Sequence, residues 1–175
     1  MNRSLLVEQL PGLRRYARAL TGNSWAADDL VQDTLERACA KWRLWVVGTD
    51  LRAWLFTLMH NLYMSQRRTA RVALNSISID ELESELQAPP TNHDDPLDIS
   101  RCLQRLPADQ RAVLLLVVLE DMSYKEAADV LAIPMGTVMS RLSRARSRLR
   151  ELMEAGRPGP GQTVPGQPPA LRRMK

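Results

Sequence analysis

Four carboxylates in one short segment are the first residues of this 175-residue chain that could do chemistry. They are Asp28, Asp29, Asp33 and Glu36. Carboxylates gathered in this way can hold a divalent metal for phosphoryl chemistry. Here all four fall on one predicted helix, where they converge poorly, and no His cluster or second carboxylate group joins them. We therefore expect no metal, no cofactor and no catalytic residue, and a chain that is not an enzyme.

A second chemical pattern is the run of arginines near the C-terminus, in residues 123–150, which read SYKEAADVLAIPMGTVMSRLSRARSRLR. Ser123 and Glu126 have the spacing of a capping box, in which each side chain bonds a backbone N–H of the first helical turn. After a short break, Pro134 can open a new helix, because its missing N–H is not needed there. The segment therefore predicts a helix, a tight turn and a second helix, which is the outline of a DNA reader.

The second helix of this motif separates an apolar stripe from a polar surface. At helical spacing, the stripe that must face the first helix consists of Val138, Leu142, Ala145 and Leu149. Gly136 could permit close packing. The outward surface carries Arg, Ser and Thr, which suit base edges and phosphates alike. Its five arginines have no acidic residue between Asp129 and Glu151 to pair with, so we favour DNA contact over a merely solvated helix.

Helical periodicity also fills the N-terminal part of the chain. A first helix is predicted over about 5–20, and a second over 24–42 with Ser24 as its N-cap. A third is predicted over 51–72 with Asp50 as its cap. The apolar faces of these three helices can form a small core.

The second of these helices carries Asp29, Gln32, Asp33 and Glu36 on the face opposite its apolar residues. Asp29 and Asp33 repel each other at this spacing, which indicates that something basic docks there. The acids of the first turn would also stabilise the helix dipole. From the residues alone, a docking surface and a solvated face both remain open.

The third helix carries aromatic and basic residues in one line, on the side away from its leucines. These residues are Phe56, His60, Tyr63, Arg67 and Arg71. We interpret the line as exposed and as suited to an opened nucleic acid, because bases stack on rings and phosphates meet cations. The alternative is that Phe56 and Tyr63 pack on a neighbouring helix or on the loop from Trp45 to Thr49.

Charge and composition divide the chain into two basic parts separated by an acidic segment. Residues 73–100 carry seven acids and no Lys or Arg, and three prolines in this segment rule out a continuous helix. After Ala155, 9 of 20 residues are Gly or Pro, which indicates a disordered basic tail. We expect an all-α fold of two small helical domains joined by a flexible acidic linker, the C-terminal one containing the helix-turn-helix. The predicted boundaries are 1–72, 73–96, 97–155 and 156–175.

Compartment and redox state follow from apolar runs and cysteine spacing. No apolar run approaches the roughly 18 residues of a membrane span, and the amphipathic N-terminus does not suit a signal peptide, so we expect a cytoplasmic protein. Cys39 and Cys102 lie far apart, without the paired spacing of a zinc site. We predict that both are reduced and at least partly buried.

With these residues in hand, the chain resembles the extracytoplasmic-function (ECF) sigma factors of bacterial RNA polymerase. The resemblance lies in DDLVQDTLERA at 28–38, in TDLRAWLFTLMHNLYMSQRR at 49–68 and in the whole of 106–151, which includes the helix-turn-helix. It implies a protein that binds core RNA polymerase, directs it to specific promoters and assists promoter opening.

The resemblance also assigns three surfaces. The surface that docks on the clamp helices of the polymerase largest subunit would comprise Asp28, Asp29, Gln32, Asp33 and Arg37. The promoter element near the start site would be read and opened by Trp45, Asp50, Phe56, His60, Asn61, Tyr63, Arg67, Arg68 and Arg71. The upstream element would be read in the major groove by Lys125, Thr137, Met139, Ser140, Arg141, Ser143, Arg144 and Arg148.

The partners that the resemblance implies are core RNA polymerase, promoter DNA and an anti-sigma factor. Family members thread the linker through channels of the polymerase, so the acidic segment is expected to meet basic walls there. The alternative is a sigma-mimicking protein that only sequesters an anti-sigma factor. Such a mimic would not need the outward Arg144 and Arg148.

Two residues of the reader helix depart from the family pattern. Met139 stands where many members carry Lys or Arg, and Ser143 stands where others carry a bulky residue. Base readout is therefore expected to rely more on Thr137, Ser140 and Arg144.

Overall fold

The computed structural model describes residues 3–42, 45, 50–75 and 95–155, and its regular structure in these ranges is entirely helical. In chain order the elements are α1 (Arg3–Thr21), α2 (Ser24–Ala40), α3 (Leu51–Asn75), α4 (Asp95–Gln104), α5 (Ala108–Leu114), the π-helical turn η3 (Leu115–Leu119), α6 (Tyr124–Leu131) and α7 (Met135–Ala155). The all-α prediction is therefore confirmed for this part of the chain. None of these helices is long and apolar enough to cross a membrane. Most of the predicted linker and the predicted tail lie outside the described residues.

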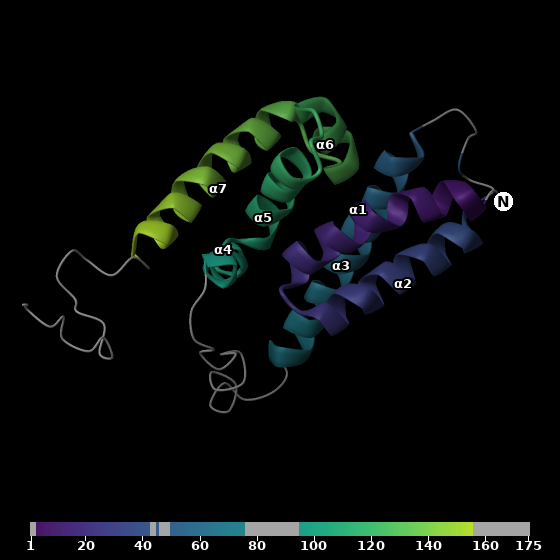
Figure 1. The fold of residues 1–175 in the computed structure, drawn as a ribbon, viewed down its shortest axis with the longest axis horizontal. Coiled ribbons are helices and arrows are strands. Elements are labelled where there is room, and N and C mark those ends of the chain that lie inside the picture. The colour runs from purple at the N-terminus through teal and green to yellow at the C-terminus, as the bar shows by residue number, and fades with distance from the viewer. Residues whose placement is uncertain (1–2, 43–44, 46–49, 76–94, 156–175) are drawn as a thin grey trace, which may run out of the picture.

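The N-terminal half is a bundle of three helices, α1, α2 and α3, which lie side by side in Figure 1. Its core is built from one apolar face of each helix. α1 buries Leu13 and Tyr16, α2 buries Leu30, and α3 buries Leu55 and Met59. Spacings of three and four residues keep such positions on one side of a helix, so each stripe points towards the bundle axis.

Side-chain caps fix the starts of α2 and α3. Asp50 Oδ1 accepts a hydrogen bond from the Ala53 N–H at 3.1 Å, as predicted. For α2 the predicted cap is wrong by one residue, because Asn23 Oδ1 accepts from the Ala26 N–H at 3.1 Å and Asn23 has the extended N-cap backbone. Gly22, with φ of 71°, makes the turn that puts Asn23 in this position.

The helix-turn-helix of the C-terminal half forms as predicted. Ser123 Oγ accepts from the Glu126 N–H at 3.2 Å, and Glu126 Oε2 accepts from the Ser123 N–H at 2.7 Å, which completes the capping box. Ala132 ends α6 in the left-handed conformation, with φ of 52°, and α7 starts after Pro134. The predicted stripe packs inward, with Leu149 partly buried and with full burial of Val138, Leu142 and Ala145.

Three expectations about single residues are wrong. A Cβ at Gly136 would meet no atom within 4 Å, so this glycine, in the exposed first turn of α7, serves no close packing. Cys39 is exposed, because it follows the buried Ala38 onto the outer side of α2; Cys102 is buried as predicted. α3 continues to Asn75, past its predicted end.

The two halves pack against each other. α1 contacts α4, α5 and η3, and α3 contacts α6. One hydrophobic cluster includes residues of both halves, among them Tyr16 and Phe56 on the N-terminal side and Leu116 and Met122 on the C-terminal side. The predicted DNA-contacting helices α3 and α7 are therefore held in one body in this structure.

Candidate docking and nucleic-acid surfaces

The predicted docking residues lie along the outer side of α2. Four of them are exposed, namely Asp28, Asp29, Gln32 and Arg37. Asp33 is half-buried, and its Oδ2 accepts a hydrogen bond from Gln66 Nε2 of α3 at 3.1 Å. Gln32 Nε2 donates to Glu36 Oε1 at 3.0 Å. Among the described residues, no three His, Cys, Asp or Glu side chains gather in a group that could hold a metal ion.

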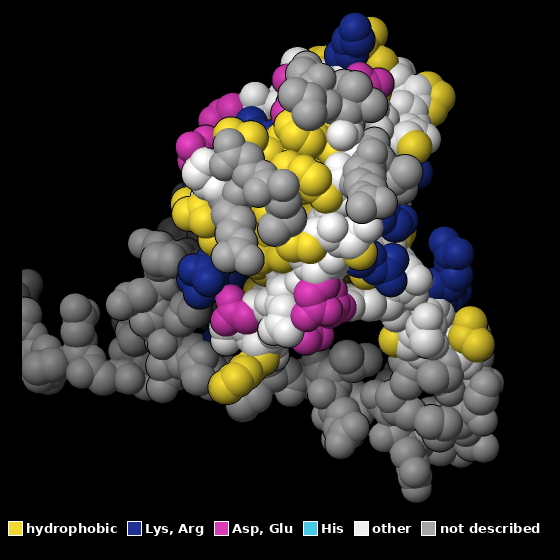
Figure 2. All heavy atoms as spheres, turned by 90° about the vertical axis from the view of Figure 1, so that its right-hand side faces the viewer, with side chains coloured by type: hydrophobic (Ala, Val, Ile, Leu, Met, Phe, Trp, Pro, Cys, Tyr) yellow, Lys and Arg dark blue, Asp and Glu magenta, His cyan; other side chains and the backbone are white. Residues whose placement is uncertain are grey.

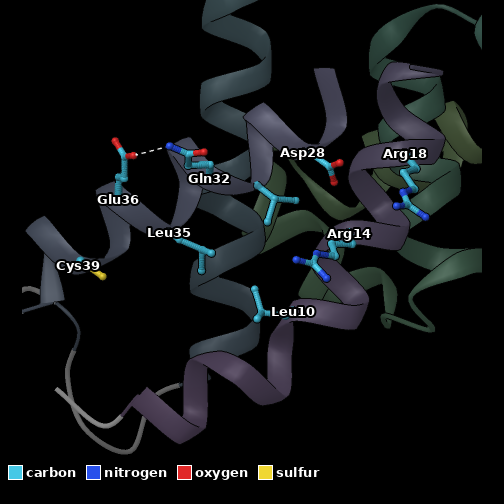
Figure 3. Close-up of a pocket in the computed structure, with 9 residues that line it drawn as sticks. Leu10, Arg14, Arg18, Asp28, Gln32, Leu35, Glu36 and Cys39 are labelled. Carbon is cyan, nitrogen blue, oxygen red and sulfur yellow. Dashed lines mark hydrogen bonds between the residues drawn. The ribbon is translucent and has the colours of Figure 1, made fainter. Parts of the chain in front are cut away.

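A groove of about 780 Å³ runs between α1 and α2, beside these residues. Figure 3 shows Arg14 and Arg18 on its α1 wall and Asp28 and Glu36 on its α2 wall. Apolar side chains, including Leu35, complete the lining. Charges of both signs beside apolar groups suit an amphipathic helix of a partner protein.

The two aromatic residues of the predicted line on α3 are buried, which corrects the prediction that the line is exposed. Phe56 and Tyr63 are only 1% and 6% exposed. The Phe56 ring meets the Tyr16 ring edge-on, with centroids 5.2 Å apart, and the Arg52 guanidinium lies 5.5 Å from the Phe56 centroid. Tyr63 Oη donates to the Leu20 carbonyl at 3.3 Å. Large rings gain most by leaving water, so the alternative of packing on a neighbouring helix is the one that holds.

His60 lies on the same covered side of α3. Its Nδ1 is buried without a hydrogen-bond partner among the described residues. Burial, followed by the positive charge of Arg141 on α7, lowers the pKa of His60 to about 4. In this conformation His60 is therefore neutral at pH 7 and offers no cation to a phosphate.

Cations occupy the later turns of α3. Arg67, Arg68 and Arg71 are exposed there, and the predicted contact Asn61 is exposed nearer the middle of the helix. Arg67 Nη1 donates to Tyr63 Oη at 3.1 Å, and its guanidinium lies 5.7 Å from the Tyr63 ring centroid. Arg111 of α5 lies close to this end of α3. Its pKa is lowered by burial, raised by Tyr63 and lowered by Arg67, so it interacts electrostatically with both of these α3 residues. α3 thus buries rings along its middle and presents basic groups towards its end.

Tryptophans gather where α2 ends and α3 begins. The Trp42 ring lies 5.0 Å from that of Trp45 and 6.5 Å from that of Trp54, centroid to centroid. Figure 2 shows hydrophobic side chains gathered on this end of the molecule. The predicted DNA contact Trp45 is thus half-buried, and Asp50 is exposed and caps α3. The rest of the predicted loop contact, 46–49, lies outside the described residues.

The outer surface of α7 is open. Exposed residues of the predicted upstream-element surface are Lys125, Met139, Ser140, Ser143, Arg144 and Arg148, and Thr137 is half-buried. Ser140 Oγ donates to the Thr137 carbonyl at 3.1 Å. The expectation that the arginines lack acidic partners is wrong for Arg141, which pairs with Asp109 of α5 at 3.2 Å. Asp109 lies far from Arg141 in sequence, so local charge counting misses it.

Sequence reasoning also misses a buried ion cluster at Glu120. The Glu120 side chain is 0% exposed. Arg15 Nε and Nη2 donate to its two carboxylate oxygens at 2.9 Å, and Arg52 Nη2 donates to Oε2 at 3.0 Å. A Cβ on Gly12 would lie 3.1 Å from Glu120 Oε2. The available signal is an acid directly after the apolar run 112–119, since a buried charge needs a partner.

Family models match both halves of the chain. Residues 6–60 match the Sigma2 domain of PhyR, and residues 97–149 match Sigma-70 region 4. The first match covers nearly all of α1, the whole of α2 with its acidic face, and the part of α3 up to His60, and the second covers the helix-turn-helix.

Curated relatives match nearly the whole chain. The ECF RNA polymerase sigma factor EcfG of Rhodopseudomonas palustris is 38% identical over 150 residues, which are 85% of this chain and 82% of that protein. The ECF RNA polymerase sigma factor SigL of Mycobacterium tuberculosis is 38% identical over 162 residues, covering 88% of this chain and 90% of SigL.

Solved structures agree with these matches. The sigma factor RpoE of Bartonella quintana, in complex with the anti-sigma factor NepR, is 35% identical with a TM-score of 0.73, over 89% of this chain and 98% of RpoE. CnrH, in complex with the cytosolic domain of CnrY, is 26% identical with a TM-score of 0.66, over 88% of each chain. The chain therefore belongs to the ECF sigma factors of bacterial RNA polymerase.

Proposed function

We propose that this sigma factor holds core RNA polymerase through the outer face of α2 and reads promoter DNA through α3 and α7. The observation that carries the proposal is the open surface of α7, where Ser140, Arg144 and Arg148 are exposed in the half that matches Sigma-70 region 4. Helix-turn-helix proteins place such a helix in the major groove. Arg144 can give a bidentate contact to guanine, and Arg148 can meet phosphate.

The docking role of α2 is supported by charge and exposure. Asp28 and Asp29 are exposed in its first two turns, and Glu36 follows on the same side. An acidic face of this kind attracts a basic helix of the polymerase and orients it during encounter. Asp33, which is half-buried, would then exchange its bond from Gln66 for a partner cation.

For the start-proximal element we propose contacts from α3 and its preceding loop. The cations and amide of the later turns carry this role, namely Asn61, Arg67, Arg68 and Arg71, with His60 joining them when it is uncovered. Phe56 and Tyr63 have a packing role, because both rings are buried in the bundle. Within this scheme 1–72 works as the docking and opening domain, 73–96 as the linker, 97–155 as the upstream reader and 156–175 as a tail.

An anti-sigma factor is the third partner that we propose. RpoE was solved in complex with the anti-sigma factor NepR, and CnrH in complex with the cytosolic domain of CnrY. The groove between α1 and α2 has the mixed lining that an amphipathic helix requires. The rival hypothesis, a mimic that only sequesters an anti-sigma factor, is not favoured, because the curated relatives that are 38% identical to this chain are ECF sigma factors. We further propose that the protein works in the cytoplasm and performs no catalytic step itself.

Reconstituted transcription tests the proposal. Core polymerase with this chain is expected to give a specific transcript from promoters found by chromatin mapping, and core polymerase alone is expected to give none. The absence of any specific transcript from the reconstituted holoenzyme would overturn the sigma function, and binding without transcription would favour the mimic.

A further inference from the structure

Glu120 joins segments that are distant in the sequence and lie in different halves of the fold. Its carboxylate accepts hydrogen bonds from Arg15 of α1, 105 residues away, and from Arg52 of α3, 68 residues away. Arg52 Nη2 also donates to the Glu120 backbone carbonyl. A second polar contact crosses between the halves at the other end of α1, where Gln104 Nε2 donates to the Ala19 carbonyl at 3.0 Å.

The burial of Glu120 makes packing of the halves depend on both arginines. A carboxylate that is fully removed from water is costly, and this cost is offset only when charged partners satisfy it. The side chains of Arg15 and Arg52 are 52% and 38% exposed. Each guanidinium is therefore already in contact with water and stays hydrated when its bond to Glu120 breaks. If the halves separate, all three charges can return to water.

The packed form places together two surfaces that should read different parts of a promoter. His60 of α3 lies close enough to Arg141 of α7 for the guanidinium to depress the pKa of the imidazole. One residue belongs to the set proposed for the start-proximal element and the other to the set proposed for the upstream element. The 19 residues 76–94 between α3 and α4 could span up to about 60 Å, so chain length does not force the halves together.

We propose that Glu120, with Arg15 and Arg52, is an intramolecular latch that holds the free chain closed, and that promoter recognition requires the latch to open. The inhibitory part rests on the proposed promoter contacts, whereas the closed form itself does not. If polymerase and an opened promoter bind only the form with separated halves, their binding shifts the population of the chain from the closed form to this open form. The apparent affinity of the free chain for these partners is reduced by the closed fraction.

Distance measurement on the full chain tests the latch directly. Spin labels are placed on the exposed Cys39 of α2 and on the variant Ser147→Cys of α7, with the buried Cys102 replaced by alanine. The chain with the intact latch is expected to give one narrow distance distribution by double electron–electron resonance. Glu120→Gln removes the charge that both guanidinium groups need, so the distribution should become longer and broader.

Two glycines provide a second variant and its matched control. Gly12→Ala adds a methyl group 3.1 Å from Glu120 Oε2, which crowds the latch, while alanine favours the α1 helix. Gly136→Ala gives α7 the same helical preference with no atom within 4 Å of the added group. Gly12→Ala should lengthen the distances, and Gly136→Ala should leave them unchanged. Unchanged far-ultraviolet circular dichroism shows that each variant is folded, and Arg15→Gln replaces Glu120→Gln if the latter unfolds.

Affinity for core polymerase separates the latch from the proposed function. The opened variants are expected to bind core polymerase several-fold more tightly than the unaltered chain. A broad distribution in the chain with the intact latch, or an unchanged narrow one in both Glu120→Gln and Gly12→Ala, overturns the latch. Open variants with unchanged affinity overturn its inhibitory role. If no form binds core polymerase while the distances change as expected, the latch stands and the proposed function fails.

Discussion

Arg141 of α7, the helix proposed to read DNA, and Asp109 at the start of α5 form an ion pair, with Nε and Oδ2 3.2 Å apart. The pair is partly exposed, at 30% and 42%, so it is worth at most about 1 kcal/mol. It nevertheless turns one arginine of α7 back towards its own half. Arg141 is therefore less available to DNA than Arg144 or Arg148.

Asp109→Ala is expected to release Arg141 for a phosphate contact. Upstream duplex binding should strengthen slightly, and the slope of log K against log salt should steepen by about 0.9, the contribution of one extra phosphate. Titration of labelled duplex at several salt concentrations measures the slope. Asp129→Ala, which removes an exposed acid of α6, is the control for net charge, and an equal slope in both variants would contradict a specific release of Arg141.

Arg144→Ala tests base readout by the open face of α7. If Arg144 contacts a base edge, the variant should lose about 1 to 3 kcal/mol on the cognate upstream element and less on scrambled DNA. Holoenzyme binding to both duplexes gives the comparison. Arg148→Ala, on the same exposed face, is expected to lose similar amounts on both, and equal losses for Arg144→Ala would assign it to phosphate alone.

Asp33→Ala should weaken binding to core polymerase, because it removes a carboxylate from the proposed docking face. Competition with unlabelled holoenzyme measures the change in Kd. Gln66→Ala is the matched control, since it breaks the same 3.1 Å bond and leaves the carboxylate in place. Equal defects in the two variants would mean that Asp33 acts by holding α2 to α3 and not by docking.

The features that the sequence predicted well are those set by near neighbours. The capping box of Ser123 and Glu126, the Asp50 cap and the inward stripe of α7 each depend on residues a few positions apart. Local hydrogen bonds and helical spacing determine them before any tertiary contact forms. The exposed outer faces of α2 and α7 followed from the same spacing, because the face opposite a buried stripe must point outwards.

The features that were missed depend on helices meeting from distant parts of the chain. The ring of Phe56 faces away from the α3 leucines, and its burial depends on α1, where Tyr16 meets it edge-on from 40 residues earlier in the chain. Glu120 likewise gains its role from Arg15, 105 residues earlier. Periodicity identifies one face of a helix as apolar, but it does not tell how many neighbours enclose the helix.

Ser123→Ala should destabilise the C-terminal half by about 1 kcal/mol, the usual cost of losing an N-cap. Chemical denaturation at pH 7 measures this loss.

The same capping box should make stability depend on pH through Glu126. Hydrogen bonds from the Ser123 side chain and then from its backbone hold the pKa of Glu126 below its usual range. A lowered carboxyl pKa contributes stability above the ordinary value near 4.5, and this contribution is lost as the pH falls below it. Chemical denaturation at pH 7 and at pH 4 should therefore show a smaller acid loss in Glu126→Gln than in the unaltered chain.

His60 should make the structure less stable in mildly acidic solution. Its pKa of about 4 lies below the ordinary 6.5, so between these values the unfolded chain binds the proton that the native form excludes. The free energy of unfolding should fall as the pH drops through this range, by at most about 3 kcal/mol, and should not change above it. His60→Phe should remove this dependence when denaturation is followed from pH 7.5 to 4.5. Replacement of the chain's other histidine, His93, serves as the control. Loss of the pH dependence in His93→Phe, or its persistence in His60→Phe, would show that another group titrates.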